Sequence, residues 1–172
     1  MTLPIPIFCL TAAMAAVVSA SASTAPAATQ ADVQIEDKNL QEFLSKLDSA
    51  QLQFHNGQPA AVKALWSHAD DVTVAGGAGG KIEKGWSNVS ARLDWASSHF
   101  SHATQSNERV AVHVAGNFAY VVQLEHIRFR APRKDEESRR DYRVTMVFRR
   151  ESDGWRIVHR QADTMTNKQV PQ

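Results

Sequence analysis

Cysteine is nearly absent from the sequence, and its scarcity removes several classes of function. Cys9 is the only cysteine among 172 residues, and it lies in a stretch that we expect to be removed from the mature protein. A mature chain without cysteine forms no disulfide, thiolate nucleophile or cysteine-based zinc site. His99 and His102 have a spacing that occurs in metal sites, but no third ligand accompanies them, so we expect no metal.

An excess of charge of either sign is also missing. The chain has 19 basic and 18 acidic residues, which is the balance of a protein that binds neither nucleic acid nor an anionic membrane. The glycine-rich segment Ala75–Lys81 lacks the spacing of a phosphate-binding loop, and no nucleophile motif of a serine hydrolase is present. The sequence therefore implies no cofactor.

The N-terminal part of the chain lacks charge altogether. The first charged residue is Asp32, and an apolar stretch at Ile5–Val18 is followed by small residues up to Ala25. This pattern resembles a secretory signal peptide at residues 1–22 with a flexible tether at residues 23–34, although no basic residue precedes the apolar stretch. The stretch is too short for a membrane span. We expect a periplasmic or secreted protein without stable membrane insertion after signal removal.

The rest of the chain has the pattern of one domain at residues 35–166, with a short tail at residues 167–172. Helical and alternating hydrophobic spacings predict helices before a run of antiparallel strands. The helices are expected at residues 35–57, 59–66 and 86–100, a short strand at 72–74, and longer strands at 108–116, 118–130, 141–150 and 154–165. We therefore predict an α+β fold, in which the helices pack on one face of a curved antiparallel sheet and leave a cone-shaped cavity for a ligand.

Four strings of the sequence carry a resemblance to a known family. They are ALWSHADDVTVAGG at 64–77, KGWSNVSARLDWAS at 84–97, GNFAYVVQLEH at 116–126 and YRVTMVFRRESDGWRIVHRQAD at 142–163. The chain resembles the SnoaL-like, DUF4440-type group of the NTF2-like superfamily, which has the ketosteroid isomerase-like fold. The resemblance implies a cone-shaped domain with a mostly apolar pocket, usually a dimer packed through the sheet. The catalytic carboxylates of the superfamily's isomerases and cyclases map onto no matching motif, and the fold serves many functions.

The last strand supplies the first candidate for chemistry. Alternation along this strand places Trp155, Ile157 and His159 on one face and Arg160 on the other. Because the first two residues are apolar, we expect His159 to face the cavity and to act as an acid or base. The alternative is a histidine that is hydrogen-bonded to a carboxylate and holds the cavity wall in place.

Two longer strands supply a possible charge pair. Glu125 and Arg143 are expected on adjacent strands, where they would meet inside the cone and orient a polar group of a substrate. The alternative is an ordinary cross-strand ion pair. Thr145 shares the expected face of Arg143, and Asp163 is expected near the cavity or near Arg143.

The segment before the first strand supplies two more titratable groups. His68 and Asp71 are expected near the cavity mouth, where an apolar wall would raise the pKa of the carboxyl group and make it a base. The alternative is that both residues serve the turn at the helix end.

Large apolar side chains complete the expected cavity. Trp66, Trp86 and Val74 are candidates for substrate contact, whereas Trp95 is expected in the core.

Two functions remain open at this point. The first is a cofactor-independent isomerase, cyclase or lyase that uses acid–base chemistry on a small hydrophobic or aromatic molecule. The second is a non-catalytic ligand-binding or assembly domain that forms a homodimer through its sheet. An empty cavity with ionisable groups in hydrogen-bond contact along its wall favours the enzyme, and a filled, dry cone excludes it.

Overall fold

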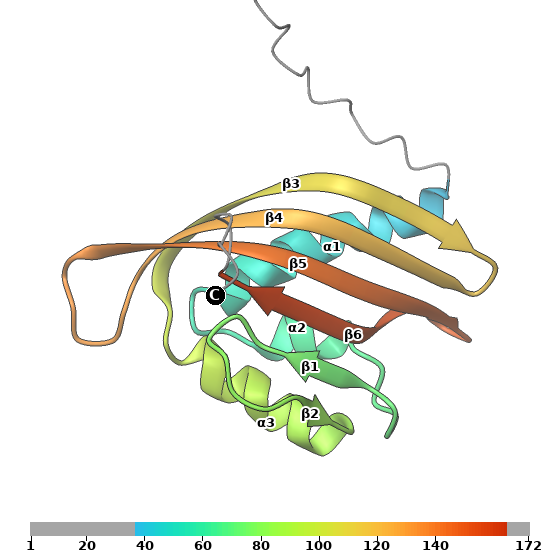
Figure 1. Ribbon diagram of the computed structural model, residues 1–172, viewed down its shortest axis with the longest axis horizontal. Helices are drawn as coiled ribbons and strands as arrows, with labels where there is room; N and C mark the ends of the chain where they lie inside the picture. Colours follow the sequence, from blue (N-terminus) through green and yellow to red (C-terminus); the bar gives the residue numbers. More distant parts are fainter. Residues whose placement is uncertain (1–36, 165–172) are drawn as a thin grey trace, which may run out of the picture. The chain divides into compact units, whose positions relative to one another are not determined.

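The structure, a computed structural model, describes residues 37–164. The expected signal peptide, tether and tail lie outside the described residues. The described part contains three helices and six strands (Figure 1). They are α1 (Lys38–Phe54), α2 (Ala60–Ala64), β1 (Thr73–Ala75), β2 (Glu83–Lys84), α3 (Trp86–Ser97), β3 (Ser101–Ala115), β4 (Phe118–Arg130), β5 (Glu137–Glu151) and β6 (Gly154–Asp163).

Helix α1 begins at a side-chain cap and is followed by a glycine turn. The carboxylate of Asp37 accepts a hydrogen bond from the backbone N–H of Leu40 at 2.9 Å, which satisfies one of the free donors of the first turn. Gly57 has a φ of 81°, a conformation that favours glycine. The buried face of the helix carries mostly apolar residues and one amide, namely Leu40, Phe43, Leu44, Leu47, Ala50 and Gln51.

The six strands form one mixed sheet in the order β2-β1-β6-β5-β4-β3. Strands β3 to β6 are antiparallel neighbours, as the alternating pattern predicts. Strand β1, however, is parallel to β6, and β2 extends the sheet beyond it. The fold is therefore the predicted α+β cone, with a mixed sheet in place of a purely antiparallel one (Figure 1).

Two strands are longer than the sequence pattern predicts. Strand β3 begins at Ser101, and β5 begins at Glu137, within a charged segment whose sequence is typical of a loop. Backbone pairing extends the β4–β5 hairpin as far as Arg130 and Glu137. Glu137 also accepts a hydrogen bond from Arg128 at 3.0 Å. Because a paired backbone tolerates charged side chains that point to solvent, hydropathy does not mark these ends.

The helices cover the concave face of the sheet. Helix α1 lies behind β4 and β5 in the view of Figure 1, and α3 lies beside β1 and β2. The side chains between these layers form one apolar core that includes Leu44, Trp66, Val121, Phe148 and Ile157. Phe43 of α1 meets Phe148 of β5 edge to face, with ring centroids 5.3 Å apart.

A bulge in β6 reverses the faces that simple alternation predicts. Ile157 pairs with Phe148, but the next residue of β5, Val147, pairs with His159, so Val158 is the extra residue. After this bulge, His159 faces the outside of the sheet and Arg160 faces the helices. The expectation that His159 faces the cavity is therefore wrong, and the expectation that Arg160 faces outward is wrong for the same reason.

Candidate functional site

A cavity of about 590 Å³ lies between the concave face of the sheet, helices α1 and α3, and the glycine-rich loop after β1. Its inner wall is mainly apolar and buried, with Leu47, Val62, Trp66, Met146 and Ile157. Half-buried or exposed lining residues form its mouth, and those with polar or aromatic side chains include Arg92, Trp95, His99, Lys134 and Arg140. This volume suits a small organic molecule.

A buried carboxylate lies next to the inner wall. Glu125 has no exposed surface, although its side chain carries an ionisable group. Arg160 donates to Glu125 Oε2 at 2.6 Å, and the amides of Gln51 and Gln123 donate to Oε1 at 3.2 and 3.0 Å. A charge of this kind is tolerated in a core only when it is paired and hydrogen-bonded, and both conditions are met here.

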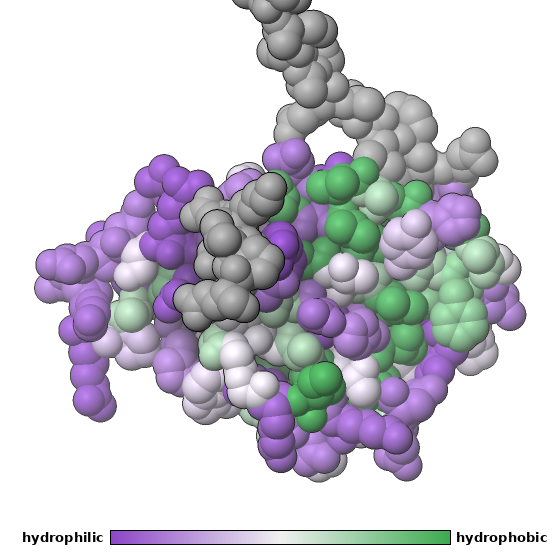
Figure 2. Space-filling model, in the orientation of Figure 1, coloured by the Kyte–Doolittle hydropathy of each residue, from purple (hydrophilic) through white to green (hydrophobic). Residues whose placement is uncertain are grey.

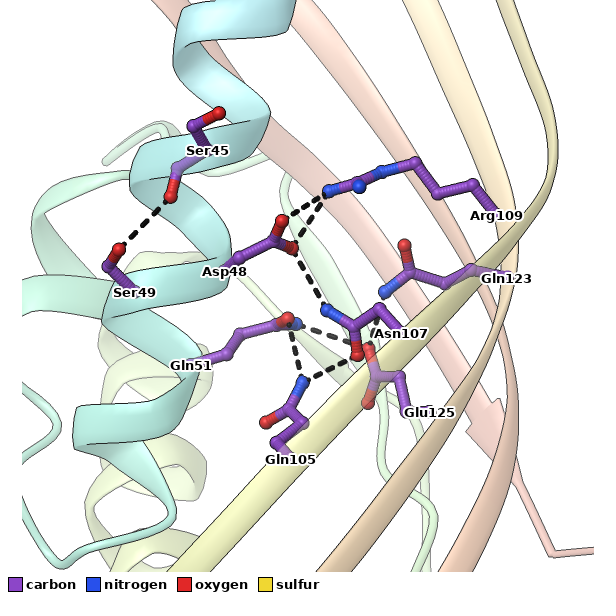
Figure 3. Close-up of polar contacts among 9 residues, drawn as sticks. All are labelled: Ser45, Asp48, Ser49, Gln51, Gln105, Asn107, Arg109, Gln123 and Glu125. Carbon is purple, nitrogen blue, oxygen red and sulfur yellow. Dashed lines mark hydrogen bonds and ion pairs between the residues drawn. The ribbon is translucent and has the colours of Figure 1, made fainter. Parts of the chain in front are cut away.

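A chain of side-chain hydrogen bonds leads from this carboxylate to His55 (Figure 3 shows its glutamine and glutamate members between α1 and the sheet). Gln105 Nε2 donates to Gln51 Oε1 at 3.3 Å, and His55 Nδ1 lies 2.7 Å from Gln105 Oε1. The carboxylate of Glu125 accepts, so the amide nitrogen of Gln51 faces it. Each amide then presents its oxygen to the next donor, which places a proton on His55 Nδ1.

The imidazole of His55 is neutral at ordinary pH. Burial lowers its pKa from 6.5 to about 4, against the negative charge of Glu125, which raises it. The side chain lines the cavity and packs edge to face on Phe54 and Phe100. Since Nδ1 is held by Gln105, Nε2 is the nitrogen left to accept a proton or hydrogen bond from a ligand.

The same hydrogen-bond system continues to the surface. Gln105 also donates to Asn107 at 2.7 Å, and Asn107 donates to Asp48 at 2.9 Å. Arg109 forms a two-bonded ion pair with Asp48, with distances of 2.8 and 2.6 Å (Figure 3). The amide of Gln105 is therefore held by acceptors on both α1 and β3, which fixes the orientation of the oxygen that meets His55.

Tyr142 adds a hydroxyl group to the cavity wall. Its side chain is largely buried, and burial raises the pKa of the phenol above its ordinary value. The hydroxyl group therefore stays protonated at neutral pH and can donate a hydrogen bond to a ligand oxygen.

Some of the residues expected to contact substrate line the cavity, and others do not. Trp66 and Val74 line the cavity. Trp86 instead stacks on His68, with ring centroids 4.0 Å apart, and neither belongs to the lining. Trp95, which was expected in the core, is 46% exposed and lines the mouth beneath the guanidinium of Arg92.

The expected pair of Glu125 and Arg143 does not form. Glu125 lies opposite Tyr142 in the ladder, and Arg143 lies on the other face, where it binds Asp163 at 2.9 Å. Thr145 shares that outer face. Glu125 pairs with Arg160 instead, because the bulge in β6 turns this arginine inward.

The expected titratable pair at the first strand is also displaced. Asp71 is exposed and binds Arg149 at 2.6 Å, and this hydrogen bond lowers the pKa of the carboxyl group, whereas a base would need a raised value. The ring of His68 is exposed and lies 3.3 Å from the backbone oxygen of Lys63. His159 contacts Thr73 on β1 at 2.8 Å, and burial lowers the pKa of its imidazole.

Sequence reasoning missed most residues of the site, among them Gln51, His55, Tyr142 and Arg160. Gln51 lies four residues after Leu47 on the apolar face of α1, and a polar residue on such a face is a usable signal. Tyr142 shares the inward face of Val144 and Met146. His55 follows the helix end, and Arg160 follows the bulge, so local patterns do not reveal either.

Within residues 37–164, no three His, Cys, Asp or Glu side chains are grouped so that they could bind a metal ion. The same residues include no helix that is long and apolar enough to cross a membrane.

Solved structures with the same architecture define the class of this fold. An NTF2-like superfamily protein from Salmonella enterica serovar Typhimurium aligns with a TM-score of 0.65 and 22% identity, covering 77% of this chain and 94% of that one. A ketosteroid isomerase-like protein from Erwinia carotovora aligns with a TM-score of 0.57 and 14% identity, over 75% and 92% of the chains. The CaMKII hub of S. rosetta aligns with a TM-score of 0.56 and 22% identity, over 76% and 97%. The domain thus has the NTF2-like fold.

The family is established by the sequence itself. The family model of the SnoaL-like domain matches residues 46–165, and the chain belongs to this family. No curated protein matches the chain.

Proposed function

We propose that the cavity binds a small, largely hydrophobic molecule and that His55 catalyses a proton transfer on it, as in an isomerisation, cyclisation or elimination without a cofactor. One observation carries the proposal. A neutral histidine lines an apolar cavity, and its Nδ1 is held by Gln105, so that Nε2 is available as a base. Ionisable and polar groups in hydrogen-bond contact along the wall of an apolar cavity are the arrangement expected of an enzyme that transfers protons.

The neighbouring groups suit the same chemistry. When a base removes a proton next to a carbonyl group, negative charge develops on the carbonyl oxygen. Tyr142 presents a protonated hydroxyl group to the cavity, and Arg160, which also lines it, supplies a positive charge balanced by Glu125. We propose that Tyr142 donates a hydrogen bond to this oxygen while His55 holds the transferred proton on Nε2.

The test uses a probe that reports a base in an apolar cavity, because the natural substrate is unidentified. In the ring opening of nitrobenzisoxazole, the base takes the carbon-bound proton, a nitrile forms, and the N–O bond breaks to release a coloured phenolate. We expect the rate to rise through about pH 4, the pKa of His55, and to stay level above it.

His55→Asn is the informative variant, because the asparagine amide can still donate to Gln105 but cannot act as the base. We expect it to lower the rate by about 100-fold or more, the usual contribution of a general base. His99→Asn changes the other histidine that lines the cavity and should keep the rate. An unchanged rate for His55→Asn, with the fold intact by circular dichroism, would exclude His55 as the base. Native mass spectrometry of protein purified from its host tests separately for a retained small molecule.

We also propose a homodimer packed through the outer face of the sheet, with or without catalysis. Figure 2 shows apolar side chains gathered on the face formed by the strands. Val110, Phe118 and Tyr120 are 57%, 49% and 41% exposed and lie on the paired strands β3 and β4, and a group of exposed apolar residues on one face is a common mark of an interface. One of the similar structures is a CaMKII hub, which supports an assembly role for this fold.

The dimer is tested by the molar mass in solution from light scattering. Tyr120→Lys should give a monomer, whereas Leu52→Lys should not, although Leu52 on α1 has the same exposed fraction of 41%. A wild-type monomer at high concentration, or equal dissociation of both variants, would contradict the proposal.

Export remains a proposal from the sequence alone. The uncharged N-terminal stretch up to Ala31 supports a periplasmic or secreted location. Mass spectrometry of the mature N-terminus tests it, and a chain that keeps Met1 in the host would contradict it.

A further inference from the structure

The charges along the cavity have one sign. Every charged side chain among the described residues that line it is basic, and no aspartate or glutamate belongs to the lining. These residues are Arg92, Lys134, Arg139, Arg140 and Arg160. The chain as a whole carries a net charge of only +1, so this concentration of positive charge is local to the cavity.

Two of the five charges are already balanced. Glu125 pairs with Arg160 at 2.6 Å, and Asp141 pairs with Arg139 at 2.9 Å. Arg140 and Lys134 have no ion pair or side-chain hydrogen bond with another residue in 37–164.

Arg92 is likewise held without an anion. Its Nη2 donates to the backbone oxygen of Gly79 at 2.7 Å, and its guanidinium lies 4.3 Å from the ring centre of Trp95. Neither partner is charged. Three cationic side chains of the cavity therefore lack a counter-charge within the described part of the chain.

The glycine-rich loop brings these cations to the rest of the site. A Cβ at Gly76 would lie 3.0 Å from Arg92 Nη2, and a Cβ at Gly77 would lie 2.3 Å from Tyr142 Cε1. Because neither glycine has a Cβ, Arg92 can approach the loop at Gly76 and Tyr142 can approach it at Gly77. Arg140 precedes Tyr142 by two residues on β5, on the same inward-facing side of the strand.

We infer that the ligand of this cavity is an apolar molecule with a carboxylate group, bound by Arg92, Lys134 and Arg140 at the mouth. The inference rests on the proposed use of the cavity as a ligand site. The apolar inner wall takes the hydrocarbon part, and the planar guanidinium groups match a carboxylate through paired N–H donors. The carboxylate anchors the molecule at the mouth and leaves its apolar end near His55.

The experiment compares three naphthalene probes that differ only in their polar group: naphthoate, neutral naphthamide and naphthyl phosphate. Quenching of intrinsic fluorescence reports binding, because Trp66 and Trp95 line the cavity. The variant is Arg140→Gln. Its matched control is Arg143→Gln, which removes the same charge three residues away on the outer face of the same strand.

We expect naphthoate to bind about tenfold or more tightly than naphthamide, because a hydrogen bond to a charged group is stronger than a neutral one. Arg140→Gln should weaken the binding of naphthoate by a similar factor and change the affinity for naphthamide by no more than about twofold. Arg143→Gln should change neither affinity.

Three results would overturn the carboxylate assignment. Equal binding of naphthoate and naphthamide would keep the cavity as an apolar ligand site and remove the anionic group from its ligand. Tighter binding of naphthyl phosphate than of naphthoate would assign a phosphate in place of a carboxylate. Equal losses in Arg140→Gln and Arg143→Gln would show a general charge effect. Failure of all three probes to bind would overturn the proposed ligand site as well.

Discussion

Acid should weaken the folded state through His55 in a defined pH range. The imidazole has a pKa of 6.5 in an unfolded chain and about 4 in the folded protein, mainly because it is buried. Between these values the unfolded chain binds a proton that the folded chain does not, so the free energy of unfolding falls as the pH falls. One unit of pKa corresponds to about 1.4 kcal/mol, and the shift therefore predicts a loss of about 3 kcal/mol between pH 6.5 and pH 4.

The assay is urea unfolding followed by tryptophan fluorescence at several pH values, for the wild type and for His55→Asn. The contribution of His55 is the difference between the two pH curves. His159 also has a lowered pKa, as do Asp37, Asp71 and Asp141, but these groups are present in both proteins and cancel in the difference.

The difference curve should rise by about 3 kcal/mol between pH 4 and pH 6.5 and be level outside that range. NMR titration of the His55 ring gives an independent value of the folded-state pKa and does not depend on the variant. Parallel curves for the two proteins, or a ring that titrates near 6.5, would refute the reasoning.

Two further predictions concern the contacts around the cavity. Glu125→Gln leaves Arg160 without its anion and should lower the free energy of unfolding by about 3 kcal/mol or more, measured with urea. The double variant Glu125→Gln/Arg160→Gln should lose less free energy of unfolding than the sum of the losses in the two single variants. Additive losses would contradict an interaction between Glu125 and Arg160. Gly77→Ala forces a methyl group against the Tyr142 ring, 2.3 Å from Cε1, and should cost about 1–3 kcal/mol. In a Tyr142→Ala background, Gly77→Ala should leave the free energy of unfolding nearly unchanged. An equal loss in that background would show that the clash with the Tyr142 ring is not the cause.

Local patterns in the sequence predict much of this fold. The bounds of β4 match the alternating segment at 118–130, β6 begins where the last segment begins, and the two tight hairpin turns contain Gly116 and Gly154, both with positive φ. These features depend on residues close together in the chain. The start of β5 and the position of β2 depend on the strand beside each, and a hydropathy pattern carries no information about that neighbour.

The candidate site was harder to predict, because one extra residue decides which side chains enter it. Alternation along β6 is correct up to Ile157 and is inverted from His159 onward by the bulge at Val158. A single-residue insertion leaves the hydrophobic pattern of so short a strand almost unchanged. The prediction therefore placed His159 on the inner face and Arg160 on the outer face, which is the reverse of the structure. Trp66 and Val74, which were also predicted from the sequence, do line the cavity.

The need for a cation beside a buried carboxylate could have revealed the error about His159 and Arg160. Alternation correctly places Glu125 on the inward face of β4, beside Val121 and Gln123, and a carboxylate that is buried there needs a cation within reach. Arg143 cannot meet this need, because Tyr142 is the residue that lies opposite Glu125 on β5. Arg109 of β3 is bound to Asp48, so the remaining arginine is on β6, where a regular strand would turn Arg160 away. A bulge before Arg160 is thus the arrangement that satisfies both the hydrophobic pattern and the buried charge.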